Sequence, residues 1–114
     1  MKPSKATDSA PVGSFEEQVM LAVLRTGSEA YGMQVRRELE KVTGRDVTIG
    51  SVYITLDRLE AKGLVTSART AGGDSPSRRV FSITASGARA LAETRAIRER
   101  LWAGVDLGTL LRKA

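Results

Sequence analysis

Three hydrogen-bonding side chains, Ser51, Thr55 and Arg58, follow one another at intervals of four and three residues in the stretch from Thr48 to Val65. In a helix this spacing places them on one side. Hydroxyl and guanidinium groups in such a row can donate to base edges or phosphates when the helix lies in the major groove of DNA. The alternative interpretation is an ordinary solvated helix face.

The other side of the same stretch predicts burial. It carries an apolar stripe made of Ile49, Val52, Tyr53, Leu56 and Leu59. Thr48 is expected to cap the helix with its hydroxyl and to lie among the residues that contact DNA. Gly50 leaves room for a phosphate to approach the free N–H groups of the first turn. The Tyr53 ring can be buried while its hydroxyl reaches a phosphate, although a purely structural tyrosine fits the pattern nearly as well. Glu60 falls within the apolar sector, so we expect it to be paired and assign it no chemistry.

Three arginines outside this helix are further candidates for DNA contacts. After Gly63 the residue pattern changes to a period of two over residues 64–70 and again over 79–83, with a Gly-, Ser- and Pro-rich loop at 71–77. The pattern predicts a β-hairpin that carries Arg69 on its outgoing strand and Arg78 and Arg79 on its returning strand. Such side chains can contact the phosphate backbone or enter a minor groove, or they can simply guard an edge strand against aggregation.

Catalysis is poorly supported by the composition. The 114 residues include neither histidine nor cysteine, and the sequence has no P-loop, no G-x-G-x-x-G and no nucleophile elbow. We therefore expect no enzyme and no bound cofactor or metal. The chain has no apolar run near the ~18 residues that span a membrane and no signal-peptide core, so the expected location is the cytoplasm, away from membranes.

The positive charge is unevenly distributed along the chain. The isoelectric point is about 10.1 and the net charge is +5. Residues 1–13 and 14–83 each carry a net charge of +1, whereas residues 84–114 carry +3. Because the central region is almost neutral, any basic surface there must come from the arrangement of its cations rather than from their number.

The order of elements predicts one α+β domain of the winged helix-turn-helix type, with three N-terminal helices, a two-stranded β-hairpin wing and a C-terminal dimerisation helix. Residues 1–13 are expected to be a disordered tail, and 14–83 the DNA-binding domain. Ser14 is expected to cap the first helix in a capping box with Glu17. The second helix is expected over residues 30–43, with Val35, Leu39 and Val42 facing inward and Arg36, Arg37, Glu40 and Lys41 facing outward.

The last helix is expected over residues 84–108, capped by Thr84 and followed by a frayed tail at 109–114. Its first turns carry one apolar face, and Ile97, Leu101 and Val105 form a second stripe rotated around the axis. One face is expected to pack on its own domain and the other on a second chain. The predicted dimer interface consists of Val19, Leu91, Ile97, Leu101, Trp102 and Val105.

Several short motifs together resemble the PadR family of bacterial transcription regulators. They are the Tyr31-Gly32 pair, Gly50-x-x-Tyr53, the Lys62-Gly63-Leu64-Val65 turn and Thr84-x-x-Gly87, in this order and spacing. The resemblance covers roughly residues 14 to 105 and points to the compact subfamily with one C-terminal dimerising helix. Proline commonly follows the tyrosine in this family, whereas Ile54 stands here.

The resemblance implies a homodimeric repressor that binds a pseudo-palindromic operator in double-stranded DNA. Tyr31 and Gly32 start the second helix, where an N-terminus can hold a phosphate, although core packing explains Tyr31 equally well. In some compact relatives an aromatic side chain of the terminal helix lines a cavity for planar apolar compounds. Trp102 is the candidate for such an effector site, with interface packing as the favoured alternative. The alternative for the whole protein is a winged-helix module that binds another protein rather than DNA.

Overall fold

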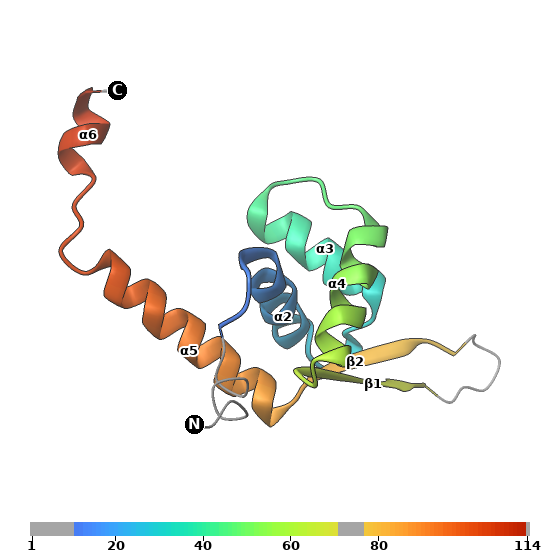
Figure 1. The fold of residues 1–114 in the computed structure, drawn as a ribbon. Helices are drawn as coiled ribbons and strands as arrows, with labels where there is room; N and C mark the ends of the chain where they lie inside the picture. Colours follow the sequence, from blue (N-terminus) through green and yellow to red (C-terminus); the bar gives the residue numbers. More distant parts are fainter. Residues whose placement is uncertain (1–10, 71–76, 114) are drawn as a thin grey trace, which may run out of the picture.

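The predicted α+β winged helix-turn-helix is the fold of the chain. The computed structural model describes residues 11–70 and 77–113 (Figure 1). Its elements, in chain order, are α2 (Ser14–Thr26), a short 3-10 turn η1 (Gly27–Glu29), α3 (Gly32–Thr43), α4 (Ile49–Ala61), β1 (Val65–Arg69), β2 (Arg79–Ile83), α5 (Ala85–Trp102) and α6 (Gly108–Lys113). Helix α2 lies in the middle, with α3 and α4 on one side and α5 on the other (Figure 1).

The hydrophobic core forms where α2, α3 and α4 meet the base of the hairpin. Apolar residues from every one of these elements are fully buried, among them Met20, Val35, Val52, Leu56 and Phe81. Spacings of three and four residues put the helical members on inward faces, whereas alternation puts Val65 and Phe81 on the inner face of the hairpin. The core therefore fixes the position of α4 relative to the wing.

The wing is an antiparallel pair in register from Val65 opposite Ile83 to Arg69 opposite Arg79. Its base is also tied to the segment between the first two helices, because the Phe81 N–H donates to the Ala30 carbonyl at 2.8 Å. The predicted loop at 71–77 falls almost wholly outside the described residues, since these resume at Ser77.

The junction between the wing and α5 explains the Thr84-x-x-Gly87 motif. The Thr84 hydroxyl accepts from the Gly87 N–H at 3.0 Å, which caps α5, and donates to the Gly63 carbonyl at 2.7 Å. A Cβ at position 87 would overlap the carbonyl oxygen of Leu64. The motif therefore combines a helix cap with a close backbone approach that only glycine allows.

Three details at the N-terminal side differ from the sequence-based expectations. Gly13, not Ser14, caps α2, and Glu16 rather than Glu17 reaches back to accept from the Gly13 N–H at 3.0 Å. Of the expected disordered tail, residues 1–10 lie outside the described residues, but Val12 packs against the core and donates its N–H to the Thr94 hydroxyl at 3.0 Å. Val42, expected to face inward, is 56% exposed and lines an apolar pocket between α2 and α3 together with Leu21 and Leu24.

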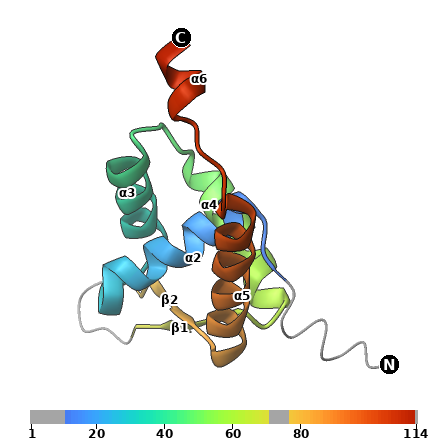
Figure 2. The same ribbon diagram turned by 90° about the vertical axis from the view of Figure 1, so that its left-hand side faces the viewer.

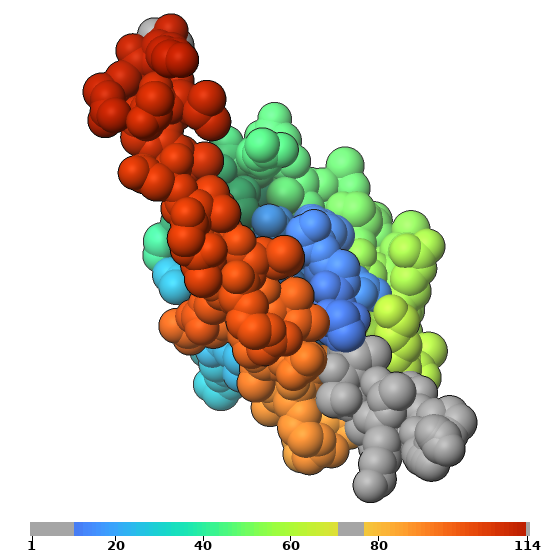
Figure 3. All heavy atoms as spheres, turned by 60° about the vertical axis from the view of Figure 1, so that its left-hand side comes forward, coloured from blue at the N-terminus to red at the C-terminus, as the bar shows by residue number. Residues whose placement is uncertain are grey.

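The C-terminal region also differs from the expectation. Helix α5 ends at Trp102 rather than near residue 108, since Ala103 adopts an extended conformation with φ −57° and ψ 127°. The expected frayed tail contains the short helix α6, which stands beyond the body of the molecule at the far end of α5 (Figures 2 and 3). None of the helices in the described ranges is long and apolar enough to cross a membrane.

Candidate nucleic-acid interface

The start of α4 is fixed by a reciprocal cap. The Thr48 hydroxyl accepts from the Ser51 N–H at 3.1 Å, and the Ser51 hydroxyl donates to the Thr48 carbonyl at 2.8 Å. This confirms the predicted cap. The cap uses the side chains of Thr48 and Ser51, which were both predicted to contact DNA. Both residues still lie at the exposed N-terminus of α4, next to Gly50.

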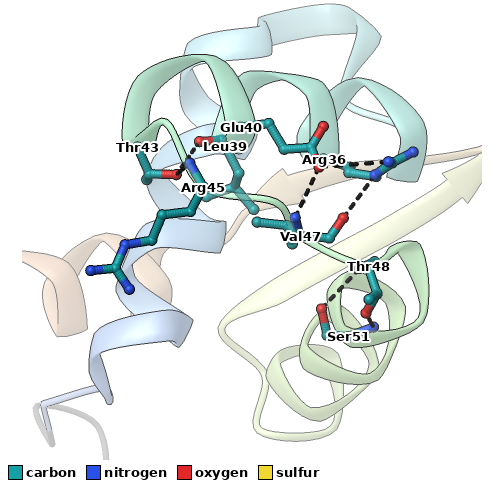
Figure 4. A network of polar contacts seen from close by, with 8 residues as sticks. All are labelled: Arg36, Leu39, Glu40, Thr43, Arg45, Val47, Thr48 and Ser51. Atoms are coloured by element: carbon teal, nitrogen blue, oxygen red, sulfur yellow. Dashed lines mark hydrogen bonds and ion pairs between the residues drawn. The ribbon is translucent and has the colours of Figure 1, made fainter.

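The turn between α3 and α4 is held by two side chains of α3 (Figure 4). The Val47 N–H donates to the Glu40 carboxylate, and Arg36 Nε donates to the Val47 carbonyl, both at 2.8 Å. Arg36 and Glu40 also pair with each other at 3.5 Å. From the sequence, both residues were expected to face solvent. Instead they hydrogen-bond the N–H and the carbonyl of Val47, and these contacts set the angle between the two helices.

The exposed face of α4 is centred on a row at intervals of four, three and four residues, formed by Gly50, Ile54, Asp57 and Ala61. Arg58 is exposed at one edge of this row and Tyr53, 36% exposed, at the other. Gly50 lies in open space, with no atom near its missing side chain. The structure thus presents Gly50, Tyr53 and Arg58 as expected and adds Ile54 and Asp57, which the sequence-based list of contacts omitted.

The prediction that Thr55 contacts DNA is wrong. Its side chain is only 7% exposed. At about 100° per residue, position 55 lies some 60° from Val52 and 40° from Leu59, both fully buried, and so faces the core. The hydroxyl led to a polar assignment that the helix geometry does not support.

The Tyr31-Gly32 pair and Tyr53 belong to one packing unit. Gly32 is buried at the start of α3, and a Cβ there would overlap the ring and hydroxyl of Tyr53. The Tyr53 ring therefore crosses the N-terminus of α3 with its outer edge exposed. Gly32 and Tyr53, both predicted to contact DNA, therefore contact each other and join α3 to the exposed helix α4.

Tyr31 lies under the wing. The guanidinium of Arg78 stacks over its ring with 4.4 Å between the Arg78 Cζ atom and the ring centroid, and its hydroxyl accepts from the Gln34 side chain at 3.1 Å. Arg78 itself remains exposed. Stacking on a ring orients a guanidinium without neutralising it, so Arg78 keeps its positive charge available at the surface.

Arg79, by contrast, is neutralised within the molecule. Its Nη2 donates to Glu60 at 2.7 Å and to Asp57 at 3.1 Å, and its guanidinium also stacks on Phe81. Glu60 accepts a second hydrogen bond from the Ser67 hydroxyl at 2.8 Å. The expectation that Glu60 is paired is confirmed, and Arg79 joins the wing to α4 with its charge satisfied by two carboxylates.

These side chains surround a cleft of about 650 Å³ between the N-terminus of α3, α4 and the wing. Its lining comprises Tyr31, Met33, Arg37, Tyr53, Asp57, Arg69, Ser77, Arg78 and Arg79. Arg37 was expected from the sequence to be a solvated residue. Its spacing of four residues from Met33 could have indicated that both side chains line the same face of α3. The cleft concentrates positive charge in a region whose sequence is almost neutral.

The far end of α4 is tied to α2. Lys62 Nζ donates to Glu16 at 2.8 Å. This hydrogen bond, with smaller effects from the Gly13 N–H and the charges of Lys62 and Arg58, outweighs partial burial and holds the pKa of Glu16 below its usual 4.5. The contact orients α4 at its C-terminal end, as the α3–α4 turn does at its start.

The sequence profile of the PadR-like family of transcriptional regulators matches residues 20–93, more than half of the chain. The chain belongs to this family. No curated protein matches the sequence. Within the family match, the Tyr31-Gly32, Gly50-x-x-Tyr53 and Thr84-x-x-Gly87 motifs are accounted for by the helix contacts and cap described above.

Solved structures of PadR-like proteins share the fold at low identity. A PadR-like transcription factor from Bacteroides fragilis superposes with a TM-score of 0.68 at 23% identity over 97% of this chain and 96% of its own. A PadR-like regulator from Bacillus cereus gives a TM-score of 0.61 at 23% identity, over 87% and 88% of the two chains. Bacillus subtilis PadR, solved in complex with operator DNA, gives 0.59 at 19% identity, over 73% of this chain and 47% of its own.

The residues predicted for a PadR-like dimer interface divide into three groups by their exposure. Val19 is fully buried in the core, so it cannot contact a second chain, and that prediction is wrong. Leu91 and Ile97 are half-buried along α5. The exposed members, 71%, 55% and 50% accessible, are Leu101, Trp102 and Val105.

Uncovered apolar residues of α2 continue this surface. Leu21 and Leu24 are 41% and 53% exposed and line a groove of about 720 Å³ between α2 and α5 together with Ile83 and Leu91. Residues 19–24 of α2 are all apolar. One side of this segment packs in the core, and the other borders the groove.

Proposed function

We propose that this PadR-like protein is a DNA-binding transcription regulator that lays α4 in the major groove and rests its wing on the adjacent backbone. The observation that carries the proposal is the charged cleft beside the exposed row of α4. Arg37, Arg69 and Arg78 surround it, and a fourth arginine of the lining, Arg79, contacts two carboxylates and holds the wing in place. Bacillus subtilis PadR, which shares the fold, is recorded with operator DNA.

We further propose that the protein acts as a homodimer on a pseudo-palindromic operator. The groove between α2 and α5 and the exposed residues Leu101 and Trp102 support a second copy as its occupant, because a lone chain of this size leaves these apolar side chains in water. Two-fold symmetry then requires half-sites about one helical turn, ~34 to 36 Å, or a multiple of it apart.

We also propose that the protein represses transcription and that a small effector releases it from DNA. A dimer that occupies a promoter blocks polymerase, and a small planar apolar compound beside Trp102 would change the angle between the two copies of α4. In vitro transcription from a promoter that contains the selected site tests the first point, since repression requires transcript to fall as protein is added. Activation instead of loss would contradict it.

Selection from a random duplex library, followed by binding measurements at several salt concentrations, tests the central proposal. An enriched site whose affinity falls steeply with salt supports DNA recognition, because released counterions drive phosphate binding. Absence of an enriched site together with salt-independent capture of a protein partner would support the alternative, a winged helix that binds protein.

Arg58→Ala separates base reading from phosphate binding at the edge of α4. If Arg58 contacts a base, the variant loses ~1 to 3 kcal/mol at the selected site and relaxes its specificity at one position. If it contacts a phosphate, affinity for all duplexes falls alike. Equal binding by variant and parent would remove Arg58 from the interface.

A further inference from the structure

Ile54 occupies the middle of the exposed face of α4, which is an unusual place for a large apolar side chain. It is 56% exposed. Gly50, four residues earlier, has no side chain, and Ala61, seven residues later, carries only a methyl group. The branched side chain of Ile54 therefore projects beyond its neighbours along the helix.

The polar side chains nearest to Ile54 on α4 make contacts within the protein or face the core. The Asp57 carboxylate accepts from Arg79, the Ser51 hydroxyl is engaged with the Thr48 carbonyl, and Thr55 faces the core. What Ile54 itself offers to a base edge is shape and apolar surface. In the major groove the apolar group of a base edge is the 5-methyl of thymine.

The position of Ile54 favours this role over a contact between protein chains. Helix α4 lies on the opposite side of α2 from α5 (Figure 1), and Ile54 is not among the residues that line the groove between α2 and α5. It shares its face with Arg58 and Tyr53 and lies one turn after Gly50, where a backbone can approach closely.

We propose that Ile54 is a specificity-determining residue that packs on the 5-methyl group of a thymine in each operator half-site. The inference rests on the proposed DNA-binding function and adds a chemical preference to it. The arginines of the cleft bind backbone of any sequence, whereas Ile54 distinguishes thymine from a base that lacks the methyl group.

Deoxyuridine provides the test, since it differs from thymidine by that methyl alone. The full-length protein is titrated with its selected duplex and with a series in which one symmetric pair of thymines at a time is replaced by deoxyuridine. Replacement of the one thymine pair that contacts Ile54 is expected to weaken binding about fourfold per half-site. This factor corresponds to ~0.8 kcal/mol for one buried methyl group. Ile54→Ala is expected to bind the thymine and deoxyuridine duplexes equally.

Val42→Ala is the matched control, because Val42 is also 56% exposed but lies at the end of α3. It should keep the full preference for thymine, and thermal melts should show that both variants fold. The inference is overturned if no replacement changes affinity by more than twofold, or if Ile54→Ala retains the preference. Failure of the proposed function would look different, since no duplex would then be enriched at all.

Discussion

Arg78 and Arg79 are adjacent in the sequence, immediately before and at the start of β2, but have different roles. Arg78 is exposed and stacks on Tyr31, so its charge is available to a ligand. Arg79 is held by Glu60 and Asp57 and links the wing to α4. Both line the same cleft, so the difference comes from their partners: Arg78 reaches the Tyr31 ring, whereas Arg79 reaches the carboxylates of α4.

Alanine substitutions should separate these two roles. Arg78→Ala is expected to weaken binding to all duplexes and to reduce the salt slope by ~2, as the loss of one phosphate contact from each of the two copies requires. Its unfolding free energy should stay within about 0.5 kcal/mol of the parent. Binding at several salt concentrations and urea unfolding measure both quantities.

Arg79→Ala should instead lower the unfolding free energy by about 1 kcal/mol, because Glu60 and Asp57 lose a partly exposed partner. An unchanged stability with a reduced salt slope would show that Arg79 is a DNA ligand rather than a link between wing and helix.

Gly32 provides a second prediction at the level of single atoms. Gly32→Ala should cost ~1 to 3 kcal/mol of stability, because the added methyl overlaps the Tyr53 ring. In a Tyr53→Ala background, where the ring is absent, the same substitution should cost much less. Urea unfolding of the four proteins forms a double-mutant cycle, and an equal cost in both backgrounds would contradict the packing described.

Glu16 makes stability depend on pH. Because its pKa is lowered in the folded state by Lys62, the contact stabilises the fold at pH values above about 4.5 and is lost as pH falls through the folded-state pKa. The unfolding free energy of Glu16→Gln should therefore fall less steeply than that of the parent between pH 5 and about pH 3. Parallel curves for the two proteins would remove the Glu16–Lys62 pair as a cause.

At the scale of elements, α4 is positioned by contacts at both ends and by the wing. Glu40 and Arg36 fix the turn before it, Lys62 ties its end to α2, and Arg79 joins its exposed side to β2. The orientation of this helix is therefore set by polar contacts from its neighbours as well as by the core.

Glu40→Ala should test the turn. Loss of the carboxylate leaves the Val47 N–H without its partner, which should cost ~1 to 2 kcal/mol in unfolding free energy and also weaken DNA binding by misplacing α4. Glu40→Gln, which keeps an acceptor oxygen, is the control and should retain most of both properties. Loss of stability with unchanged affinity would separate the turn from the interface.

The elements were predictable from the sequence to the extent that they depend on local patterns. Thr48 and Thr84 precede runs of helical period, and both cap their helices as expected. Thr55 was misplaced because its residue type was weighted over its angle on the helix, and Val19 because an apolar helix can be covered by its own chain. The links made by Arg79 and Glu40 join residues that only the tertiary structure brings together, so no local pattern could indicate them.

At the scale of the whole molecule, the apolar groove and the charged cleft lie on different sides of α2 and suit different partners. The radius of gyration, 16.8 Å, exceeds the ~13 Å typical of a compact chain of this length, as expected when α5 and α6 extend beyond the body. An extended helix that exposes Leu101 and Trp102 is suited to a second copy, while the cleft is left free for DNA.

If the proposed dimer forms through α5, Leu101→Glu should convert it into monomers by placing a charge in the apolar interface. Sedimentation equilibrium measures the mass, and Thr66→Glu, which adds the same charge on the exposed side of the wing, is the control. The Leu101 variant should also bind the selected duplex far more weakly, since each half-site then binds alone. A dimeric mass for the variant would contradict the role of α5 in dimerisation.

The most direct test of the central claim is the salt dependence of binding to a selected duplex. If two copies of Arg37, Arg69 and Arg78 contact six phosphates, the logarithm of the binding constant should fall linearly with the logarithm of salt concentration with a slope of about −5. The same slope should apply to unrelated duplexes at lower affinity, because these arginines bind backbone. Failure to enrich any duplex, or an affinity that does not change with salt, would contradict the account.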